Sequence, residues 1–456
     1  MSGRRLLLDV SSTARWAGPP GGIIRLEQQL IAAARASRPD IVLGVFDPVC
    51  GQYRAVTPAW QETVFGDHGA LVLADAPADP RRRGRLPRRG DLLFALEALR
   101  LTTPRPWLAS AIDRLERTAA RLTRHSIQMF GPDGARFSYV PGHLALGDVI
   151  PLGRGDVVLT AGYDWLRKPP ARIAALKAAT GLRYIVTCYD MIPLLRPEFY
   201  DTFEVEGFRR YWHEVLPMAD RVLVISQFTH DSLVTWAGQH GLPVPAVSHV
   251  TIGSSIGAPG AEIEPTLPAG LLPGRFVLMV GTIEPRKGHR LILDLWRELL
   301  AEGIPQRAGH VLVFVGRPGW KTASLIADIE ATAGPHFMHI ADAWDARLER
   351  LYRDAAFCLM PSEIEGFGLP VVEAFAHGKA TLASTGGALP EVVGDLSPCL
   401  PVSDRARWKA TITRWLESGD DRVAYERRIA DVFERTTISQ IADSFWDAAD
   451  HTGRLH

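Results

Sequence analysis

Residues 357–395 have the sequence FCLMPSEIEGFGLPVVEAFAHGKATLASTGGALPEVVGD, and this stretch decides the fold. A buried strand over 357–360 ends in a loop, and Pro370 follows at a position that suits the first turn of a helix. Gly366 and Gly368 let the backbone approach a ligand closely. The free amides at the helix start and the helix dipole favour an anion such as a diphosphate. The stretch therefore predicts a strand–loop–helix unit with an anion site at the loop.

Two glutamates flank this loop with seven residues between them. Glu365 lies in the loop and Glu373 in the first turns of the helix. Because ligands of open α/β sheets bind at the carboxyl ends of the strands, both side chains are expected to face one crevice. Carboxylates in contact with a phosphate would repel it, so we expect them to accept hydrogen bonds from sugar hydroxyls. A solvated loop acid and a helix-favouring acid would explain either glutamate alone, but not the whole pattern.

The rest of the chain repeats short apolar runs, each followed by a helical pattern. Continuous apolar runs indicate strands that are buried on both faces, which is typical of parallel sheets covered by helices. The sequence therefore predicts an α/β fold with two doubly wound domains. The expected strands are 5–10, 41–46, 157–162, 184–188, 221–226, 249–252, 276–281, 310–316, 337–341, 357–361 and 380–384.

The domain boundary is expected in residues 257–274, which are rich in Pro and Gly and have no strong periodicity. This places one domain over 1–262 and a second over 263–438. The tail over 439–456 is expected to form a last helix that packs back on the first domain.

Composition narrows the class of protein. The chain has 456 residues, which is too long for one ordinary core, and its 51 basic and 51 acidic residues cancel, so global charge favours no partner. Cys50, Cys188, Cys358 and Cys399 are isolated from one another, which disfavours zinc and disulfide scaffolds and favours a cytoplasmic compartment. No apolar run approaches the roughly 18–20 residues of a membrane span, so a membrane would be met only at its inner surface.

Residues 76–124 carry many arginines and very few acids. A solvated loop followed by a surface helix explains them. A cationic patch for anionic lipid or for a pyrophosphate-linked acceptor explains them equally well. Nucleic acid is disfavoured, because no aromatic residues or binding motif accompany the charge.

A second motif, FVLMVGTIEPRKGHRLIL, covers residues 276–293. Its strand ends at Gly281, and a turn through Pro285 brings Arg286 and Lys287 just before a helix. Two cations at a helix start suit a diphosphate leaving group. A basic pair on a solvated turn is the alternative.

The spacing of Glu365 and Glu373 within EGFGLPVVE resembles the E-x7-E signature of family 4 retaining glycosyltransferases. The likeness extends to PSEIEGFGLP before the pair and to GGALPEVVGD after it. It implies the GT-B fold, in which two Rossmann-like domains face each other across a cleft. The domain over 1–262 would then bind the acceptor, and the domain over 263–438 the nucleotide sugar.

The resemblance also implies roles for the motif residues of the second domain. Glu365 would lie by the transferred sugar, and Glu373 would bind the ribose. The turn GTxEPRKG is similar to the family's phosphate-binding turn, which makes Arg286 and Lys287 the cations of the leaving group. Further donor contacts would come from Gly366, Phe367, Gly368, Leu369, Thr282 and Arg317, although Thr282 stands where many members carry arginine.

The first domain carries weaker motifs. Gly21 and Gly22 resemble the family's glycine loop over the diphosphate and acceptor, although an ordinary turn explains a lone glycine pair as well. Tyr189 replaces the histidine that many members carry before an aspartate, and this puts the usual contribution of that residue in doubt. Asp190 matches that aspartate and is expected to orient the acceptor.

The resemblance implies transfer with retention, since we identify no general base for inversion. No Asp-x-Asp motif follows a strand, so we expect no cofactor and no metal. The donor is expected to be a nucleotide-diphosphate hexose, first of all GDP-mannose, because the motifs resemble bacterial mannosyl- and rhamnosyltransferases of surface-polysaccharide assembly. The acceptor would be a glycan or a polyprenyl-linked glycan. The alternative is a catalytically degenerate scaffold that binds nucleotide sugar, because Tyr189 and Thr282 depart from the family pattern.

Overall fold

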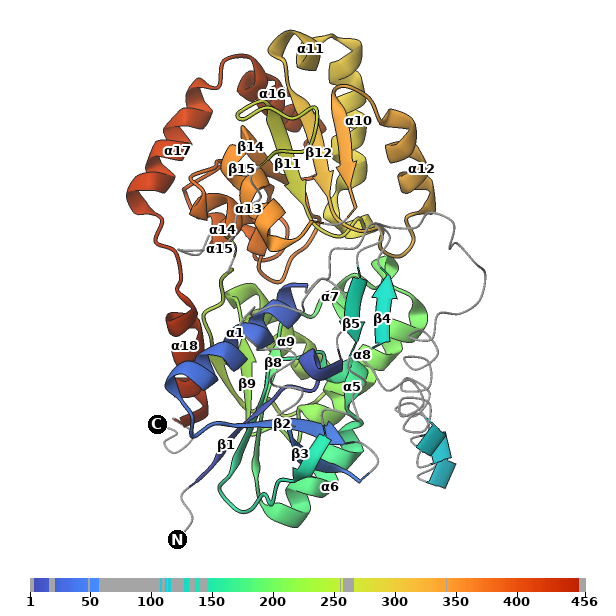
Figure 1. The fold of residues 1–456 in the computed structure, drawn as a ribbon, viewed down its shortest axis with the longest axis vertical. Helices are drawn as coiled ribbons and strands as arrows, with labels where there is room; N and C mark the ends of the chain where they lie inside the picture. The colour runs from blue at the N-terminus through green and yellow to red at the C-terminus, as the bar shows by residue number, and fades with distance from the viewer. Residues whose placement is uncertain are drawn as a thin grey trace.

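The computed structural model describes residues 4–15, 21–47, 50–56, 146–254, 256, 266–341 and 343–450, together with short segments between 107 and 139. Two α/β units lie one above the other (Figure 1). The arginine-rich segment 76–124 lies almost entirely outside the described residues. The expected parallel, helix-covered sheets are present in both units, so the predicted fold class is confirmed.

The first unit is built on an eight-stranded sheet with the order β10-β9-β8-β7-β1-β2-β3-β6. Its strands are β1 (Leu6–Asp9), β2 (Val42–Asp47), β3 (Gln52–Val56), β6 (Leu146–Val149), β7 (Val157–Thr160), β8 (Arg183–Cys188), β9 (Arg221–Val224) and β10 (Ala246–His249). In a separate two-stranded sheet, β4 (Ile127–Phe130) pairs antiparallel with β5 (Arg136–Tyr139). Its helices are α1 (Gly22–Ser37), α5 (Asp164–Arg167), α6 (Pro170–Thr180), α7 (Ile192–Leu195), α8 (Thr202–Val215) and α9 (Gln227–Gln239), with 3-10 turns η1 (Thr13–Arg15) and η3 (Pro197–Phe199).

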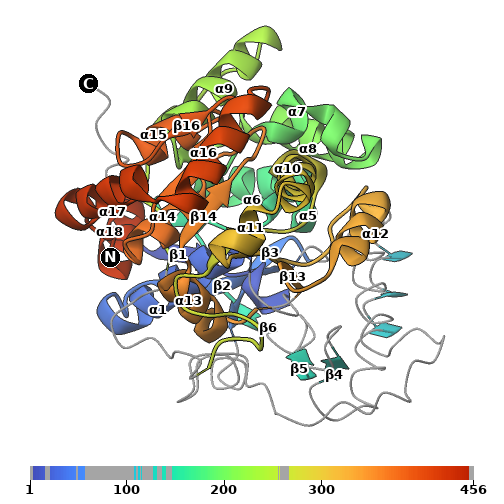
Figure 2. The same cartoon turned by 90° about the horizontal axis from the view of Figure 1, so that it is seen from above.

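The second unit is built on a six-stranded, fully parallel sheet with the order β13-β12-β11-β14-β15-β16. Its strands are β11 (Phe276–Val280), β12 (Val311–Val315), β13 (Phe337–Ile340), β14 (Phe357–Met360), β15 (Thr381–Ser384) and β16 (Cys399–Leu400). Its helices are α10 (His289–Ala301), α11 (Ile304–Ala308), α12 (Ala323–Thr332), α13 (Asp345–Asp354), α14 (Leu369–Ala376), α15 (Leu389–Val393), α16 (Arg405–Glu417) and α17 (Asp420–Val432), with the 3-10 turn η4 (Pro285–Lys287). Seen from above, α14 and β14 lie near the middle of the molecule, between α17 and α12 (Figure 2).

Both sheets have a topological switch point, where the strand order reverses. In the first sheet it lies between β1 and β7, and in the second between β11 and β14. Loops that leave the carboxyl ends of such neighbouring strands diverge and open a crevice for a ligand. The two predicted donor motifs follow β11 and β14, so the topology brings them together at one crevice.

Three details of the sheets differ from the sequence prediction. The strand expected over 249–252 is wrong, because β10 ends at His249. Val250 and Ile252 are apolar because they pack into the core beyond the strand end. The half-polar strands β3 and β6 pair antiparallel at the sheet edge and were not predicted, nor was the two-residue strand β16.

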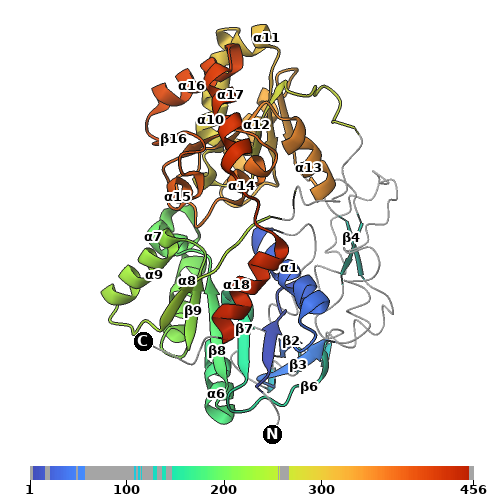
Figure 3. The same cartoon turned by 90° about the vertical axis from the view of Figure 1, so that its left-hand side faces the viewer.

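The last helix, α18 (Ile438–Asp450), lies beside α1 of the first unit (Figure 3). Its apolar face carries Phe445 and Trp446, which belong to the same buried cluster as residues of β1 and α1. The chain therefore crosses between the units twice, once before β11 and once after α17. In the described part of the chain, no helix has both the length and the apolar character that a membrane span requires.

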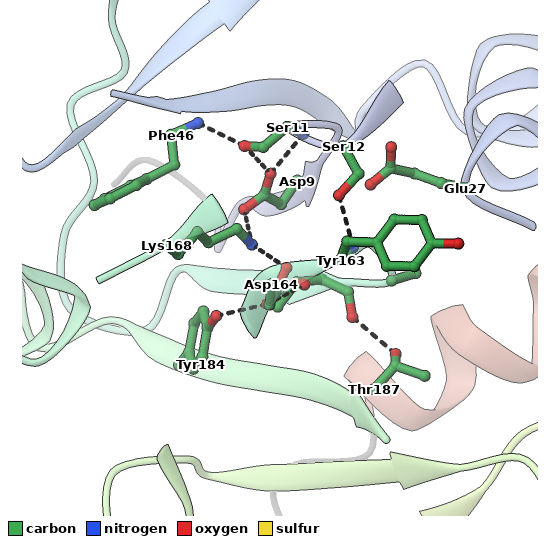
Figure 4. A network of polar contacts seen from close by, with 12 residues as sticks. Asp9, Ser11, Ser12, Glu27, Phe46, Tyr163, Asp164, Lys168, Tyr184 and Thr187 are labelled. Atoms are coloured by element: carbon green, nitrogen blue, oxygen red, sulfur yellow. Dashed lines mark hydrogen bonds and ion pairs between the residues drawn. The ribbon is translucent and has the colours of Figure 1, made fainter. Parts of the chain in front are cut away.

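A buried ionic group supports the switch point of the first sheet (Figure 4). The Lys168 ammonium pairs with Asp9 at the end of β1 and lies 2.6 Å from an Asp164 oxygen after β7, and all three side chains are at most 3% exposed. Tyr53 donates to Asp9 over 2.7 Å, and Tyr184 donates to Asp164 over 2.9 Å. This group fixes the two loops that leave the switch point relative to each other.

Removing the Lys168 ammonium should destabilise the protein strongly, because two buried carboxylates would lose their shared cation. We expect Lys168→Ala to lower the free energy of unfolding by about 3–5 kcal/mol, measured as a shift of the urea transition.

Lys177→Ala is the matched control. Lys177 pairs with Asp220 over 2.6 Å, but both side chains are about a quarter exposed. Its loss should cost roughly 1 kcal/mol or less. Equal and small losses for the two variants would show that the buried group does not support the fold.

Candidate active site

Glu365 lies at the centre of the second unit's switch point, in the loop after β14. Its two carboxylate oxygens accept hydrogen bonds from different cations of the turn after β11. Arg286 Nη1 donates to Oε2 over 2.9 Å, and Lys287 Nζ donates to Oε1 over 2.6 Å. The Glu365 side chain is 8% exposed. Burial alone would raise its pKa, but Arg286 and Lys287 together lower the pKa to about 2. Glu365 is therefore held ionised at neutral pH.

More acidic groups surround this pair of cations. Glu284 is buried, and its Oε1 forms an ion pair with Arg286 Nη2 over 2.8 Å. Burial raises the pKa of Glu284, and Arg286 opposes that rise. From the first unit, Asp190 lies within electrostatic range of Arg286 and Glu365, and burial raises the pKa of Asp190 as well. The cluster thus joins residues of both units.

Glu373 lies in α14 and has partners of its own. Ser254 Oγ donates to its Oε1 over 2.8 Å, and the Tyr352 hydroxyl donates to its Oε2 over 2.7 Å. Ser254 belongs to the segment that connects the two units, and Tyr352 to α13. Because each carboxylate oxygen has two lone pairs, Glu373 keeps the capacity to accept further hydrogen bonds from a ligand.

The glycine loop between the two glutamates lies against the first unit. The Gly366 carbonyl accepts a hydrogen bond from Ser226 Oγ over 2.7 Å, and the same hydroxyl caps α9 by accepting from Thr229 N over 3.0 Å. Phe367 and Leu369 are partly buried against the core of the first unit. Gly368 has φ +117°, a left-handed conformation that glycine adopts without strain, and precedes the first residue of α14.

The first-unit glycines lie at the same contact. Gly21 caps the N-terminus of α1, and a Cβ atom added to it would lie 3.7 Å from the Tyr163 hydroxyl. A Cβ atom added to Gly22 would lie 2.9 Å from Leu369 Cδ1. The absence of a side chain at Gly22 therefore allows the start of α1 to approach Leu369 after the glycine loop, whereas Gly21 makes no close contact of this kind.

Tyr189 and Asp190 both have local partners. The Tyr189 hydroxyl donates to the carbonyl of Ala161, so its polar end is directed into the first unit. Asp190 Oδ1 accepts from Ile192 N over 2.9 Å and so orders the turn before α7. The side chain that replaces the expected histidine is thus held by the fold.

Two of the residues that were predicted to contact the donor sugar nucleotide are exposed to solvent. Thr282 and Arg317 are exposed, at the ends of β11 and β12 respectively. Arg317 is close enough to Tyr163 to oppose the rise of the Tyr163 pKa to about 12, which burial causes. Within the described ranges, no three His, Cys, Asp or Glu side chains are grouped as metal ligands would be.

Sequence reasoning missed several residues of the site. These are Glu284, Ser254, Tyr352, Tyr163 and Tyr200, the last of which lies in electrostatic range of Arg286 and Glu365. Glu284 stands within the quoted EPRKG turn, and its place beside Arg286 was the only local signal. The others come from segments that lie outside the two motifs.

The comparisons with known proteins agree with this geometry. Residues 272–431 match the family model described as "Glycosyl transferases group 1". These residues contain both glutamates and both cations, so the second unit is similar to this family over most of its length, and the predicted resemblance to a glycosyltransferase family is confirmed there.

The curated relatives are bacterial transferases. The chain is 28% identical over 255 residues to the serotype-specific mannosyltransferase WbdA of Escherichia coli, a match that covers 52% of this chain and 30% of WbdA. It is 29% identical over 215 residues to the O-antigen chain mannosyltransferase B of Escherichia coli, covering 47% of this chain and 56% of that protein. The chain therefore spans less than two thirds of the length of these relatives.

Solved structures match over the whole chain. Anabaena HepE, solved in complex with UDP and glucose, superposes with a TM-score of 0.59 at 15% identity and covers 98% of this chain and 99% of its own. Sucrose-phosphate synthase from Thermosynechococcus elongatus gives 0.56 at 16% identity, covering 98% and 96%. Likeness at this level of identity shows the fold, which is GT-B.

Gly366 should tolerate no side chain. A Cβ atom there would collide with the Tyr189 carbonyl and lie 2.8 Å from Asp190 Cβ, so Gly366→Ala should force the two units apart. We expect faster hydrogen–deuterium exchange at the N-terminus of α9 and in residues 363–369. The matched control is Gly238→Ala in α9, where nothing lies within 4 Å of an added Cβ. Unchanged exchange in both variants would contradict a tight contact at Gly366.

Proposed function

We propose that this chain is a retaining glycosyltransferase that moves a hexose, first of all mannose, from a nucleotide-diphosphate sugar to an acceptor hydroxyl. The observation that carries the proposal is Glu365, a buried carboxylate kept ionised by two cations beside a helix N-terminus, within the residues that match the transferase family. An ionised carboxylate accepts hydrogen bonds from sugar hydroxyls, and adjacent cations and amides stabilise a leaving diphosphate.

The chemistry proposed follows from the charges. Departure of the nucleoside diphosphate places negative charge on its terminal phosphate, next to the amides that begin α14 and to the cationic turn after β11. The amides are already in place, so they need little reorganisation as the charge develops. Glu365 would hold the transferred sugar, Glu373 the ribose, and Asp190 the acceptor. The contact between the glycine loop and the first unit would exclude water that competes with the acceptor.

The sugar and acceptor are proposed from the relatives. Mannose is favoured because two of the matched proteins are named mannosyltransferases, and GDP is the nucleotide that we propose with it. For the acceptor we propose a glycan or a polyprenyl-linked glycan, reached from the cytoplasmic face of a membrane. The arginine-rich sequence 76–124 would supply attraction to an anionic surface there.

Nucleotide binding should identify the donor class. We expect one of GDP, UDP, dTDP and ADP, with GDP as the first candidate, to raise the melting temperature of the wild type, because a ligand that binds only the native state stabilises it. Glu373→Ala should lose most of this shift, since charged hydrogen bonds to ribose contribute about tenfold or more in affinity.

A control separates the pocket from the fold. Glu298→Gln changes an exposed carboxylate of the same domain that pairs with Arg405 and Lys409, and should keep the full nucleotide-induced shift. No shift with any nucleotide would favour the scaffold alternative or a site that forms only with acceptor, and turnover would then decide.

Glu365→Ala should reduce turnover with little loss of nucleotide affinity, because Glu365 contacts the sugar in this proposal. We expect kcat to fall by about 10²–10³-fold, measured as release of nucleoside diphosphate from the donor sugar with acceptor present. The wild-type assay with and without EDTA tests the proposed independence of metal. Full activity of Glu365→Ala would contradict the site assignment.

A further inference from the structure

Arg286 is surrounded by acceptors of the protein itself. Its Nη1 donates to Glu365 Oε2 over 2.9 Å and to the Ile364 carbonyl over 3.0 Å, and its Nη2 lies 2.8 Å from Glu284 Oε1. Its own carbonyl accepts from Glu363 N over 2.7 Å. The side chain is 14% exposed. Both ends of the guanidinium fork are thus occupied by groups that are fixed in the fold.

Lys287 is held much less firmly. In the part of the chain that the structure describes, its ammonium donates to Glu365 Oε1 over 2.6 Å. An ammonium has three hydrogens on a flexible stem, whereas guanidinium is a planar fork that loses its geometry if it turns. Rotation of Lys287 toward an incoming anion would therefore break one ion pair and leave Glu365 paired with Arg286. Rotation of Arg286 would break three contacts.

Glu284 explains why Arg286 stays in place. The Glu284 side chain is 3% exposed. The preceding residue, Ile283, forms two backbone hydrogen bonds with the loop after β12. Ile283 N donates to the Arg317 carbonyl over 2.9 Å, and the Ile283 carbonyl accepts from Gly319 N over 2.8 Å. A buried carboxylate requires a cationic partner, and Arg286 is that partner. The loop after β12 thus fixes Glu284, and Glu284 fixes Arg286.

We propose that Glu284 and Arg286 form a positioning relay that holds Glu365 against the transferred sugar, and that Lys287 alone of the two cations turns to bind the leaving diphosphate. The inference rests on the proposed glycosyl transfer and divides the roles of its two cations. Arg286 then acts through Glu365, and the diphosphate is bound by Lys287 and the amides at the start of α14.

The test compares three site variants with one control. Glu284→Gln is isosteric and removes the relay's charge, Arg286→Lys keeps a charge but loses the fork, and Lys287→Ala removes the mobile ammonium. Arg290→Ala is the control, because Arg290 is an exposed cation in the first turn of α10 and pairs with Asp328. Each protein is measured for the dissociation constant of the nucleoside diphosphate that stabilises the wild type, and for kcat and KM.

Lys287→Ala should weaken diphosphate binding by about tenfold or more. Glu284→Gln and Arg286→Lys should leave this affinity within about threefold and lower kcat at least tenfold. The control should match the wild type. Weakening of diphosphate binding by Arg286→Lys as large as that by Lys287→Ala, with kcat retained, would overturn the relay.

The pH dependence of kcat distinguishes the relay from a purely structural role of Arg286, because a structural role would not shift the pKa of Glu365. Arg286, Lys287, Glu284, Asp190 and Tyr200 face Glu365, and the cations hold its pKa low. Arg286→Gln should therefore raise that pKa and move the acid limb of the kcat profile to higher pH, because Glu365 must be ionised to act.

If this variant fails to fold, the isosteric Glu284→Gln still decides. If the wild type turns over and the site variants have unchanged kcat and diphosphate affinity, only the relay is contradicted. If the wild type shows neither turnover nor diphosphate binding, the proposed function is contradicted as well.

Discussion

A carboxylate buried away from water remains ionised only where cations and donors surround it. Glu365 meets this condition because β11 and β14 are neighbours in the second sheet, although residues 281–356 lie between the end of β11 and the start of β14. Parallel strands send their following loops to the same edge, so the cationic turn after β11 and the glycine loop after β14 converge. The order of the strands in the sheet therefore brings the two cations to Glu365 and keeps its carboxylate ionised.

The contact between the two units depends on the same loop. Gly366 faces the first unit through its carbonyl, which accepts from Ser226, and through the absence of a side chain, which leaves room for Tyr189 and Asp190. Ser254 of the connecting segment reaches Glu373. Each glutamate of the motif is thus linked to the first unit or to the segment that leads from it. Glu365 is linked through the neighbouring Gly366, and Glu373 through Ser254. These contacts therefore link both glutamates to residues outside the second sheet.

Sequence patterns predicted those parts of the site that are local. The strand, glycine loop and helix over 357–376 could be predicted because each signal lies within a few residues of the next. The partners of Glu373 could not, since Ser254 and Tyr352 are 119 and 21 residues away and neither carries a distinctive motif. The strand expected over 249–252 was wrong because buried loop residues and buried strand residues have the same apolar character.

Tyr189 departs from the family pattern at this position, and its contacts in the structure indicate what the tyrosine does there. Its hydroxyl is bound to the Ala161 carbonyl in the first unit, so it does not take over hydrogen bonds that a histidine would make with a donor sugar. Its backbone carbonyl, in turn, accepts from Thr229 Oγ1 over 3.1 Å beside Gly366. Tyr189 therefore supports the loop contact instead. In the proposed transfer, Glu365 would balance charge that develops at the sugar. The ionisation of Glu365 depends on Arg286 and Lys287, so this proposed role depends on the cationic turn after β11.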